Sequence, residues 1–166
     1  PNHPLKKYFP DNVWPTTVAD FEPVFKNMFQ SLDDTGRILL QALTGPLEVD
    51  KDYFTRMTDT GSSILRLLHY PPIPAGVTPG AVRAAAHEDI NLITLLVSAS
   101  SSGLELLTRE GEWLAVDAAP DTLIVDSGDM LARITNDVIP STTHRVVNPT
   151  GPNLSRYSMP FFMHPN

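Results

Sequence analysis

Apolar side chains in this chain recur with one period before Gly61 and with another after it, and this change restricts the folds that the chain can adopt. Between residues 18 and 43 the spacings are three and four, which predicts one long amphipathic helix of about 27 residues. Gly45-Pro46 ends that helix, and residues 50–57 are expected to form a second, short one. Residues 1–60 are therefore predicted to be an N-terminal linker and helical segment.

Short apolar runs separated by turn residues follow one another after Gly61. Runs of this length and spacing predict strands that pair as an antiparallel sandwich or barrel. Arg109-Glu110-Gly111 lies between two of them and indicates a hairpin. Seven expected strands cover residues 63–69, 92–97, 104–108, 112–116, 123–126, 144–148 and 156–163, residues 130–135 are an expected eighth, and residues 82–86 lead into His87. The chain is thus predicted to be mainly β, with residues 61–166 forming one β domain after the two helices.

The composition excludes several classes of protein. With 166 residues, 42% of them hydrophobic, the chain is long enough for one globular domain with a core. A net charge of −7 argues against nucleic-acid and anionic-membrane partners, so an anionic ligand needs a local cation. Because cysteine is absent, a disulfide, an iron–sulfur cluster and a thiolate zinc site are excluded. No segment resembles a membrane span or a secretory signal, so we expect a cytoplasmic location.

His87-Glu88-Asp89, with His144 far along the chain, is the most informative polar pattern. In an extended segment, residues two apart point to the same face, so His87 and Asp89 could bind one metal while Glu88 points away. Two imidazoles and one carboxylate suit Fe(II), with Mn, Ni or Zn as competitors. The alternative for His-x-Asp alone is a turn with a surface histidine and a capping aspartate.

Arg156 and Ser158 share one face of the last predicted strand in the same way. A guanidinium holds a carboxylate with two parallel hydrogen bonds, and the hydroxyl can add a third. Tyr70, before Pro71-Pro72, could reach the same anion. Both assignments have a structural alternative: Arg156 could be an ordinary edge-strand arginine, and Tyr70 could be packed with its hydroxyl at the rim.

Other polar and apolar candidates are weaker. His69 and Arg145 alternate away from Tyr70 and His144, so both are expected to be structural. The remaining side chains are interpreted as solvated histidines (His3, His164), turn residues (Asp126, Asp129), and residues that suit either the cavity wall or the core (Met130, Ile134, Met159, Phe161).

Several blocks in order along the chain together resemble isopenicillin N synthase and its relatives, in the Fe(II)/2-oxoglutarate-dependent dioxygenase superfamily. The blocks are His87-Glu88-Asp89-Ile90-Asn91-Leu92-Ile93-Thr94, Gly103-Leu104-Glu105-Leu106, Gly111-Glu112-Trp113, Asp126-Ser127-Gly128-Asp129, Ser141-Thr142-Thr143-His144-Arg145-Val146 and Arg156-Tyr157-Ser158-Met159-Pro160-Phe161-Phe162. The resemblance runs from about Leu65 to Pro165. Leu68 departs from it, because plant members usually have Asn there.

This resemblance implies a double-stranded β-helix, or jelly roll, in which His87, Asp89 and His144 bind iron. It also implies that Arg156 and Ser158, helped by Tyr70, hold the distal carboxylate of 2-oxoglutarate. The expected reaction consumes O2 and couples decarboxylation of 2-oxoglutarate, to succinate and CO2, to hydroxylation, desaturation or cyclisation of a small-molecule substrate. Family members usually carry an additional N-terminal half, so we expect this chain to be part of a longer protein.

Two other functions stay open at this point. An isopenicillin N synthase-like oxidase would use O2 without 2-oxoglutarate and place a substrate carboxylate on the Arg-x-Ser pair. A non-catalytic jelly-roll binding module would have a degenerate site. Nothing in the sequence indicates the prime substrate or the oligomeric state.

Overall fold

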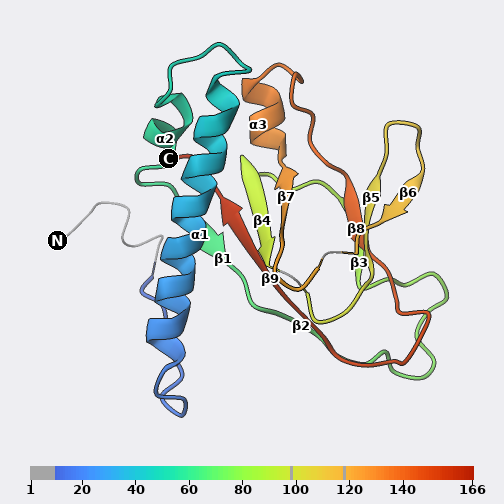
Figure 1. The fold of residues 1–166 in the computed structure, drawn as a ribbon. Helices are drawn as coiled ribbons and strands as arrows, with labels where there is room; N and C mark the ends of the chain where they lie inside the picture. Colours follow the sequence, from blue (N-terminus) through green and yellow to red (C-terminus); the bar gives the residue numbers. More distant parts are fainter. Residues whose placement is uncertain (1–9, 98, 118) are drawn as a thin grey trace.

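Two antiparallel β-sheets and one long helix make up most of the computed structural model, which describes residues 10–97, 99–117 and 119–166 (Figure 1). The chain is therefore mainly β, as the sequence predicts. The strands are β1 (Ile64–Leu65), β2 (Leu68–Tyr70), β3 (Ala84–His87), β4 (Ile93–Val97), β5 (Leu104–Leu107), β6 (Trp113–Ala115), β7 (Leu123–Ser127), β8 (His144–Val146) and β9 (Arg156–Met163). The helices are α1 (Phe21–Thr44), α2 (Tyr53–Met57) and α3 (Asp129–Ile134).

The larger sheet has the order β1-β9-β4-β7, and β2 pairs with the other end of β9. Strand β4 lies in its interior and is almost wholly buried, because its sequence is a continuous apolar run broken only by Thr94. Its alternating side chains serve two layers: Ile93 and Leu95 join the core under α1, whereas Thr94 and Leu96 face a pocket on the other side. One strand therefore contributes to both the core and the candidate site.

The smaller sheet has the order β3-β8-β5-β6. Its predicted hairpin is present, and Gly111 adopts a φ of 84° in the turn between β5 and β6, a conformation that favours glycine. A second hydrophobic cluster joins the two sheets through Leu96 of the larger one and Leu104 and Val146 of the smaller one. Its side chains fill the space between the two sheets beside the pocket.

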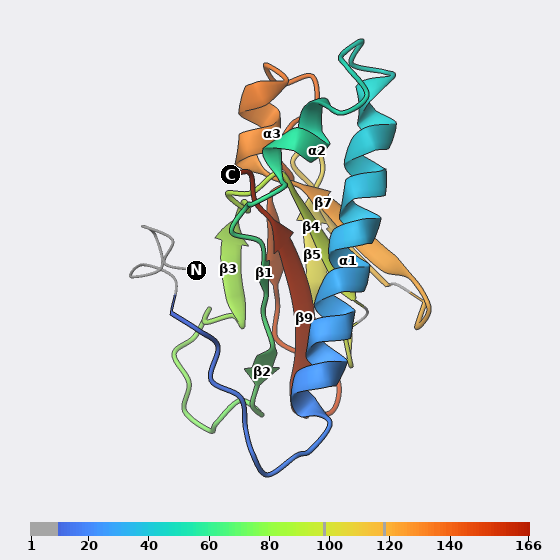
Figure 2. The same ribbon diagram turned by 90° about the vertical axis from the view of Figure 1, so that its left-hand side faces the viewer.

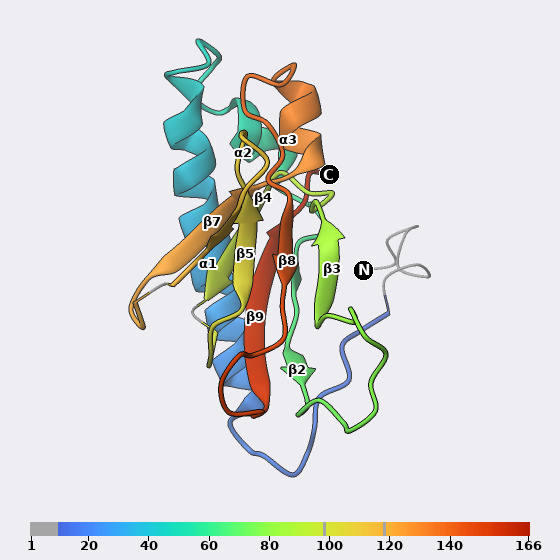
Figure 3. The same ribbon diagram turned by 90° about the vertical axis from the view of Figure 1, so that its right-hand side faces the viewer.

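Helix α1 covers the face of the larger sheet that is turned away from the smaller sheet, so that three layers follow one another (Figures 2 and 3). Its apolar stripe buries Leu32 and Leu40 against Phe161 and Met163 of β9. Gly36 permits the close approach, because a Cβ atom there would lie 2.7 Å from the sulfur of Met163. Among the described residues, no helix is long and apolar enough to cross a membrane.

Two predicted elements differ in the structure. Residues 130–135 were expected to be a strand, but residues 130–134 belong to α3 and Thr135 is its C-cap. A short apolar run in the sequence does not distinguish a strand from a helix. The single strand expected at residues 63–69 is divided into β1 and β2, although both parts pair with β9. The interruption leaves Arg66 between them, bonded through its backbone N–H to the Pro160 carbonyl at 3.0 Å.

Candidate active site

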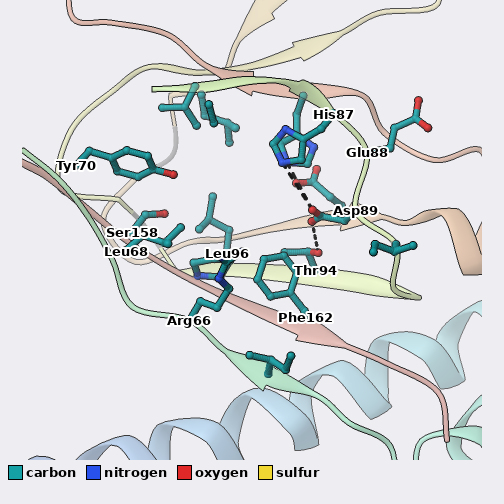
Figure 4. Close-up of a pocket in the computed structure, with 18 of the residues that line it drawn as sticks. Arg66, Leu68, Tyr70, His87, Glu88, Asp89, Thr94, Leu96, Ser158 and Phe162 are labelled. Carbon is teal, nitrogen blue, oxygen red and sulfur yellow. Dashed lines mark hydrogen bonds and ion pairs between the residues drawn. The ribbon is translucent and has the colours of Figure 1, made fainter. Parts of the chain in front are cut away.

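A pocket of about 710 Å³ lies between the two sheets and collects most of the polar residues singled out in the sequence (Figure 4). Its wall on the larger sheet comes from β1, β2, β4, β7 and β9, and its wall on the smaller sheet from β3, β5 and β8. His87, Asp89, His144, Tyr70, Arg156 and Ser158 all line it. Residues from distant parts of the chain therefore face one cavity.

His87, Asp89 and His144 form the only group among the described residues whose donor atoms could hold a metal ion, with those atoms within 4.8 Å of one another. Nε2 of His87 lies 3.9 Å from Oδ1 of Asp89, and Nε2 of His144 lies 4.0 Å from the same oxygen. His87 and His144 are brought together by the antiparallel register of β3 and β8, in which they are direct partners. Two neutral nitrogens and one carboxylate oxygen suit Fe(II) and leave one side of the site open.

The two imidazoles are fixed in the orientation that metal binding needs. Nδ1 of His87 lies 2.7 Å from the Ala85 carbonyl, and Nδ1 of His144 lies 3.1 Å from the Thr142 carbonyl. Because a carbonyl oxygen only accepts, Nδ1 must carry the proton in each ring, and the lone pair remains on Nε2. In both residues Nε2 is the atom nearest to Asp89.

Asp89 is held by a network of buried groups. The Thr94 hydroxyl donates a hydrogen bond of 2.5 Å to Oδ2 of Asp89 and accepts one of 2.8 Å from the Asn91 amide. The Asp89 carbonyl accepts the backbone N–H of Asp129, the first residue of α3, at 2.8 Å. Gly128 makes this approach feasible, since a Cβ atom there would lie 2.7 Å from the Asp89 carbonyl oxygen. Oδ2 is thus engaged by the protein, and Oδ1 faces the imidazoles.

Arg156 has an unpaired donor deep in the protein. Its side chain is only 2% exposed, and Nη1 has no hydrogen-bond partner, while Nε donates to the Ser101 carbonyl at 3.2 Å. Burial lowers the pKa of Arg156 from its ordinary value, Tyr70 opposes that shift and Arg83 adds to it. An unpaired donor on a buried charged group is costly, so Nη1 requires an acceptor that the described residues do not supply.

Tyr70 and Ser158 flank this guanidinium through strand register. Tyr70 pairs with Arg156 and Leu68 with Ser158 across β2 and β9. The Tyr70 ring lies 5.5 Å from Cζ of Arg156, within the range of a cation–π contact. Leu68, the position noted above as a departure from the resemblance, lines the pocket.

Asp126 was interpreted from the sequence as a turn residue, and this interpretation is wrong. It lies in β7 directly opposite Thr94, is 5% exposed and lines the pocket. Burial raises its pKa, His144 opposes the rise and Asp89 adds to it. The available signal was its place in the run Leu123 to Ser127, where an acidic side chain interrupts apolar residues.

His164 also departs from its predicted role. We expected a solvated side chain, but it is half-buried and lines the pocket beyond the end of β9. Burial lowers its pKa, and Asp89 acts in the opposite direction. The pocket therefore extends past the metal-binding group toward the C-terminal end of β9.

The remaining candidates lie outside the pocket. His69 stacks on Tyr157 with ring centroids 4.7 Å apart, and Arg145 donates to Glu105 at 2.6 Å, so their structural roles are confirmed. Four residues considered for the cavity wall do not line it; Phe161 belongs to the core, Met130 packs against the core, Ile134 is 38% exposed and Met159 is half-buried. His3 lies outside the described residues.

The family model of the 2OG-Fe(II) oxygenase superfamily matches residues 61–165. This match covers more than half of the chain and contains both the metal-binding group and Arg156. The chain therefore belongs to this superfamily, in agreement with the resemblance identified in the sequence.

Individual relatives support the same assignment. A 2-oxoglutarate-Fe(II) type oxidoreductase of Aspergillus fumigatus is 34% identical over 155 residues, which cover 91% of this chain and 45% of the relative. A solved 2OG-Fe(II) oxygenase family protein from Caulobacter crescentus is 46% identical, with a TM-score of 0.88 over 99% of this chain and 53% of its own. A protein of Neurospora crassa, solved in complex with alpha-KG and thymine, is 36% identical, with a TM-score of 0.85 over 92% of this chain and 49% of its own. The chain thus spans about half the length of the proteins it matches.

Proposed function

We propose that this protein is a non-haem Fe(II) oxygenase that couples oxidative decarboxylation of 2-oxoglutarate to oxidation of a small organic substrate. The observation that carries the proposal is the unpaired Nη1 of the buried Arg156, which lines the same pocket as His87, Asp89 and His144. A metal ligand set and a desolvated cation in one cavity suit a ligand that chelates a metal at one end and carries a carboxylate at the other.

His87, Asp89 and His144 hold the metal in this proposal. Their donor set, with each Nε2 free and Oδ1 of Asp89 directed at both rings, fits Fe(II) with open positions for 2-oxoglutarate and O2. Bound Fe(II) supplies the redox chemistry of O2 that oxidises 2-oxoglutarate and the substrate C–H bond. The protein contributes orientation, because Thr94 and Asn91 fix the Asp89 carboxylate before any ligand arrives.

Arg156 and Ser158 bind the distal carboxylate of 2-oxoglutarate in this proposal. Nη1 of Arg156 gains the acceptor that it lacks, and Ser158, 5% exposed, can donate its hydroxyl to the same carboxylate. The Tyr70 ring lies 5.5 Å from Cζ of Arg156, close enough for a cation–π contact with the guanidinium. Leu96, Leu104 and Val146 form an apolar wall beside these groups, so the ion pair forms in a site of low dielectric.

The two sheets are proposed to be the double-stranded β-helix, with residues 61–166 as the catalytic jelly-roll domain and residues 1–60 as the linker and helical segment before it. The antiparallel pairing, the pocket between the sheets and the family match from residue 61 support this division. The cytoplasmic location and the absence of nucleic-acid and membrane partners stay predictions from the sequence.

Release of succinate from 2-oxoglutarate tests the proposal. Purified protein with Fe(II), ascorbate and O2 should convert 2-oxoglutarate to succinate, slowly without prime substrate and faster with one. His144→Ala should lose metal binding and turnover while keeping the fold, because one of three ligands is removed. His69→Ala is the matched control, since this histidine lies on the exposed side of β2, outside the pocket.

The outcomes separate the alternatives. Metal-dependent O2 consumption without 2-oxoglutarate binding would favour an isopenicillin N synthase-like oxidase. Absence of both metal binding and 2-oxoglutarate binding would favour a non-catalytic module. Full turnover in His144→Ala would contradict the assignment of the metal ligands.

A further inference from the structure

The pocket contains a second arginine that the proposed function does not use. Arg66 and Arg156 are the only arginine or lysine side chains among the described residues that line it. Arg66 lies between β1 and β2, on the same face as Ile64 and Leu68, which also line the pocket. Figure 4 shows it beside Phe162, across the pocket from His87.

Arg66 has no carboxylate partner among the described residues. The contact made by its guanidinium is with the Phe162 ring, whose centroid lies 5.8 Å from Cζ. A guanidinium that lies on an aromatic ring keeps the N–H groups at its edge available for a planar, two-oxygen acceptor. Arg66 is exposed, lies on an aromatic ring and forms no ion pair with the described residues, so its charge is available to a ligand.

Arg145 in the same protein shows what such a guanidinium can hold. Cζ of Arg145 lies 3.9 Å from the centroid of Trp113, and Nε at the same time donates to Glu105 at 2.6 Å. Arg66 has the aromatic ring of this arrangement and lacks the carboxylate. The N–H groups of Arg66 that correspond to this pairing are therefore available to an acid.

Arg66 and Arg156 are too far apart along the sheet to share one carboxylate. The guanidinium of Arg66 lies over Phe162, and that of Arg156 lies over Tyr70. Phe162 follows Arg156 by six residues of β9, or about 20 Å of extended chain. The pocket thus has two separate positions for negative charge. The deep one at Arg156 is assigned to 2-oxoglutarate, which leaves the open one at Arg66 for another molecule.

We propose that Arg66 binds the prime substrate, and that this substrate is a small organic acid with an apolar body. Its oxyanion pairs with the guanidinium, and its apolar part contacts Ile64 and Phe162. Because the protein carries a net charge of −7, its overall field repels such an acid, and this local cation has to select it. The inference rests on the proposed function, which reserves Arg156 for 2-oxoglutarate.

Binding to protein loaded with Zn(II), a redox-inert ion that suits the same ligands, and with saturating 2-oxoglutarate tests the inference. The probes are 3-phenylpropionate and its neutral counterpart 3-phenylpropanamide, and dissociation constants come from ligand-observed NMR titrations. The wild type should bind the acid about tenfold more tightly than the amide, the ratio of a charge-assisted hydrogen-bonded pair to a neutral one. Arg66→Met should remove this preference, and Arg66→Lys should retain part of it.

Arg109→Met is the matched control, since Arg109 is an exposed arginine in the β5–β6 turn, outside the pocket. Equal binding of acid and amide by the wild type, or a preference that survives in Arg66→Met, would overturn the inference. The inference would also be overturned if the wild type bound thymine more tightly than 3-phenylpropionate and Arg66→Met bound thymine equally well. A different result would contradict the proposed function: the Zn(II)-loaded wild type would not bind 2-oxoglutarate. In that case, binding of the acid and of the amide is compared in the absence of 2-oxoglutarate.

Discussion

The hydroxyl of Thr94 donates a hydrogen bond of 2.5 Å to the Asp89 oxygen that faces away from the two imidazoles. Thr94 lies in the interior strand β4, whereas Asp89 lies in the loop that follows the edge strand β3. The hydroxyl therefore connects the only carboxylate of the metal-binding group to a buried, interior strand of the larger sheet.

Thr94→Val should weaken metal binding because it removes this bond while keeping the shape of the side chain. Loss of a hydrogen bond to a metal-binding residue lowers affinity by about 10- to 100-fold. Thr94→Ser keeps the hydroxyl and should remain near the wild type. Calorimetric titration with Mn(II) measures the affinities, and equal affinity in the wild type and Thr94→Val would refute the role of this bond.

Arg156→Met should separate ligand binding from stability. We expect the dissociation constant of 2-oxoglutarate to rise by about 30-fold or more, or about 2 kcal/mol, because a buried charged partner is removed. Metal affinity should not change, since Arg156 does not contact the metal ligands. Without ligand, the variant should be as stable as the wild type or more stable, because a buried guanidinium with an unpaired Nη1 is replaced by an apolar side chain.

Thermal unfolding with and without 2-oxoglutarate provides the measurement for Arg156→Met. The ligand-induced rise in Tm should be present in the wild type and absent in the variant. A lower Tm of the ligand-free variant would show instead that Arg156 serves mainly to support the fold.

Gly128→Ala should damage the fold and the metal site together. The added Cβ would lie 2.7 Å from the carbonyl oxygen of Asp89 and closer still to that of Asn91, and both are backbone atoms that cannot move alone. We expect a loss of about 1–3 kcal/mol in the free energy of unfolding, the usual cost of overpacking. Gly45→Ala is the control, since nothing lies within 4 Å of its Cβ position and φ is −61°. Urea unfolding that is equal in the two variants would contradict this account.

Asp126→Asn should change how stability depends on pH. Because burial raises the pKa of Asp126 above 3.8, this carboxyl stabilises the fold most when protonated. Its contribution is lost as the pH rises through the unfolded and then the folded pKa. Asn cannot ionise, so the variant should gain stability relative to the metal-free wild type as the pH rises.

Urea unfolding of metal-free protein from about pH 4 to pH 8 tests this dependence. Asp121→Asn changes an exposed carboxylate in the loop before β7 and should follow the wild type. Parallel curves for Asp126→Asn and the wild type would show that this carboxyl titrates alike in the folded and unfolded states.

Local sequence patterns predicted the parts of this site that depend on strand alternation. Arg156 and Ser158 share a face of β9 because they are two residues apart. His87 and Asp89 also converge, but Asp89 lies in the loop after β3, and Glu88, which was expected to point away, lines the pocket too. Arg145 was assigned to the opposite side from His144 by the same rule, and its pairing with Glu105 agrees. Side-chain direction along one strand is a local property, so sequence is sufficient for it.

Features that depend on contacts between distant segments were not predictable in the same way. Asp126 resembles a turn residue because Gly128 follows it closely, and only its pairing with Thr94 makes it a buried carboxylate. Arg66 belongs to no motif, and only the pairing of this segment with β9 shows that its alternate side chains, Ile64, Arg66 and Leu68, line the pocket. The helical form of residues 130–134 depends on packing that a short apolar run does not specify.

The cluster of Leu96, Leu104 and Val146 has a consequence for ligand selection. It separates the two sheets, and the imidazoles stand on the smaller sheet while Arg156 stands on the larger one. In the proposed function, a molecule that reaches both must span the distance that this packing helps to set. Apolar side chains that form no hydrogen bond with the ligand thereby limit the length of its carbon chain. A diacid that is shorter or longer would reach one end of the site and miss the other.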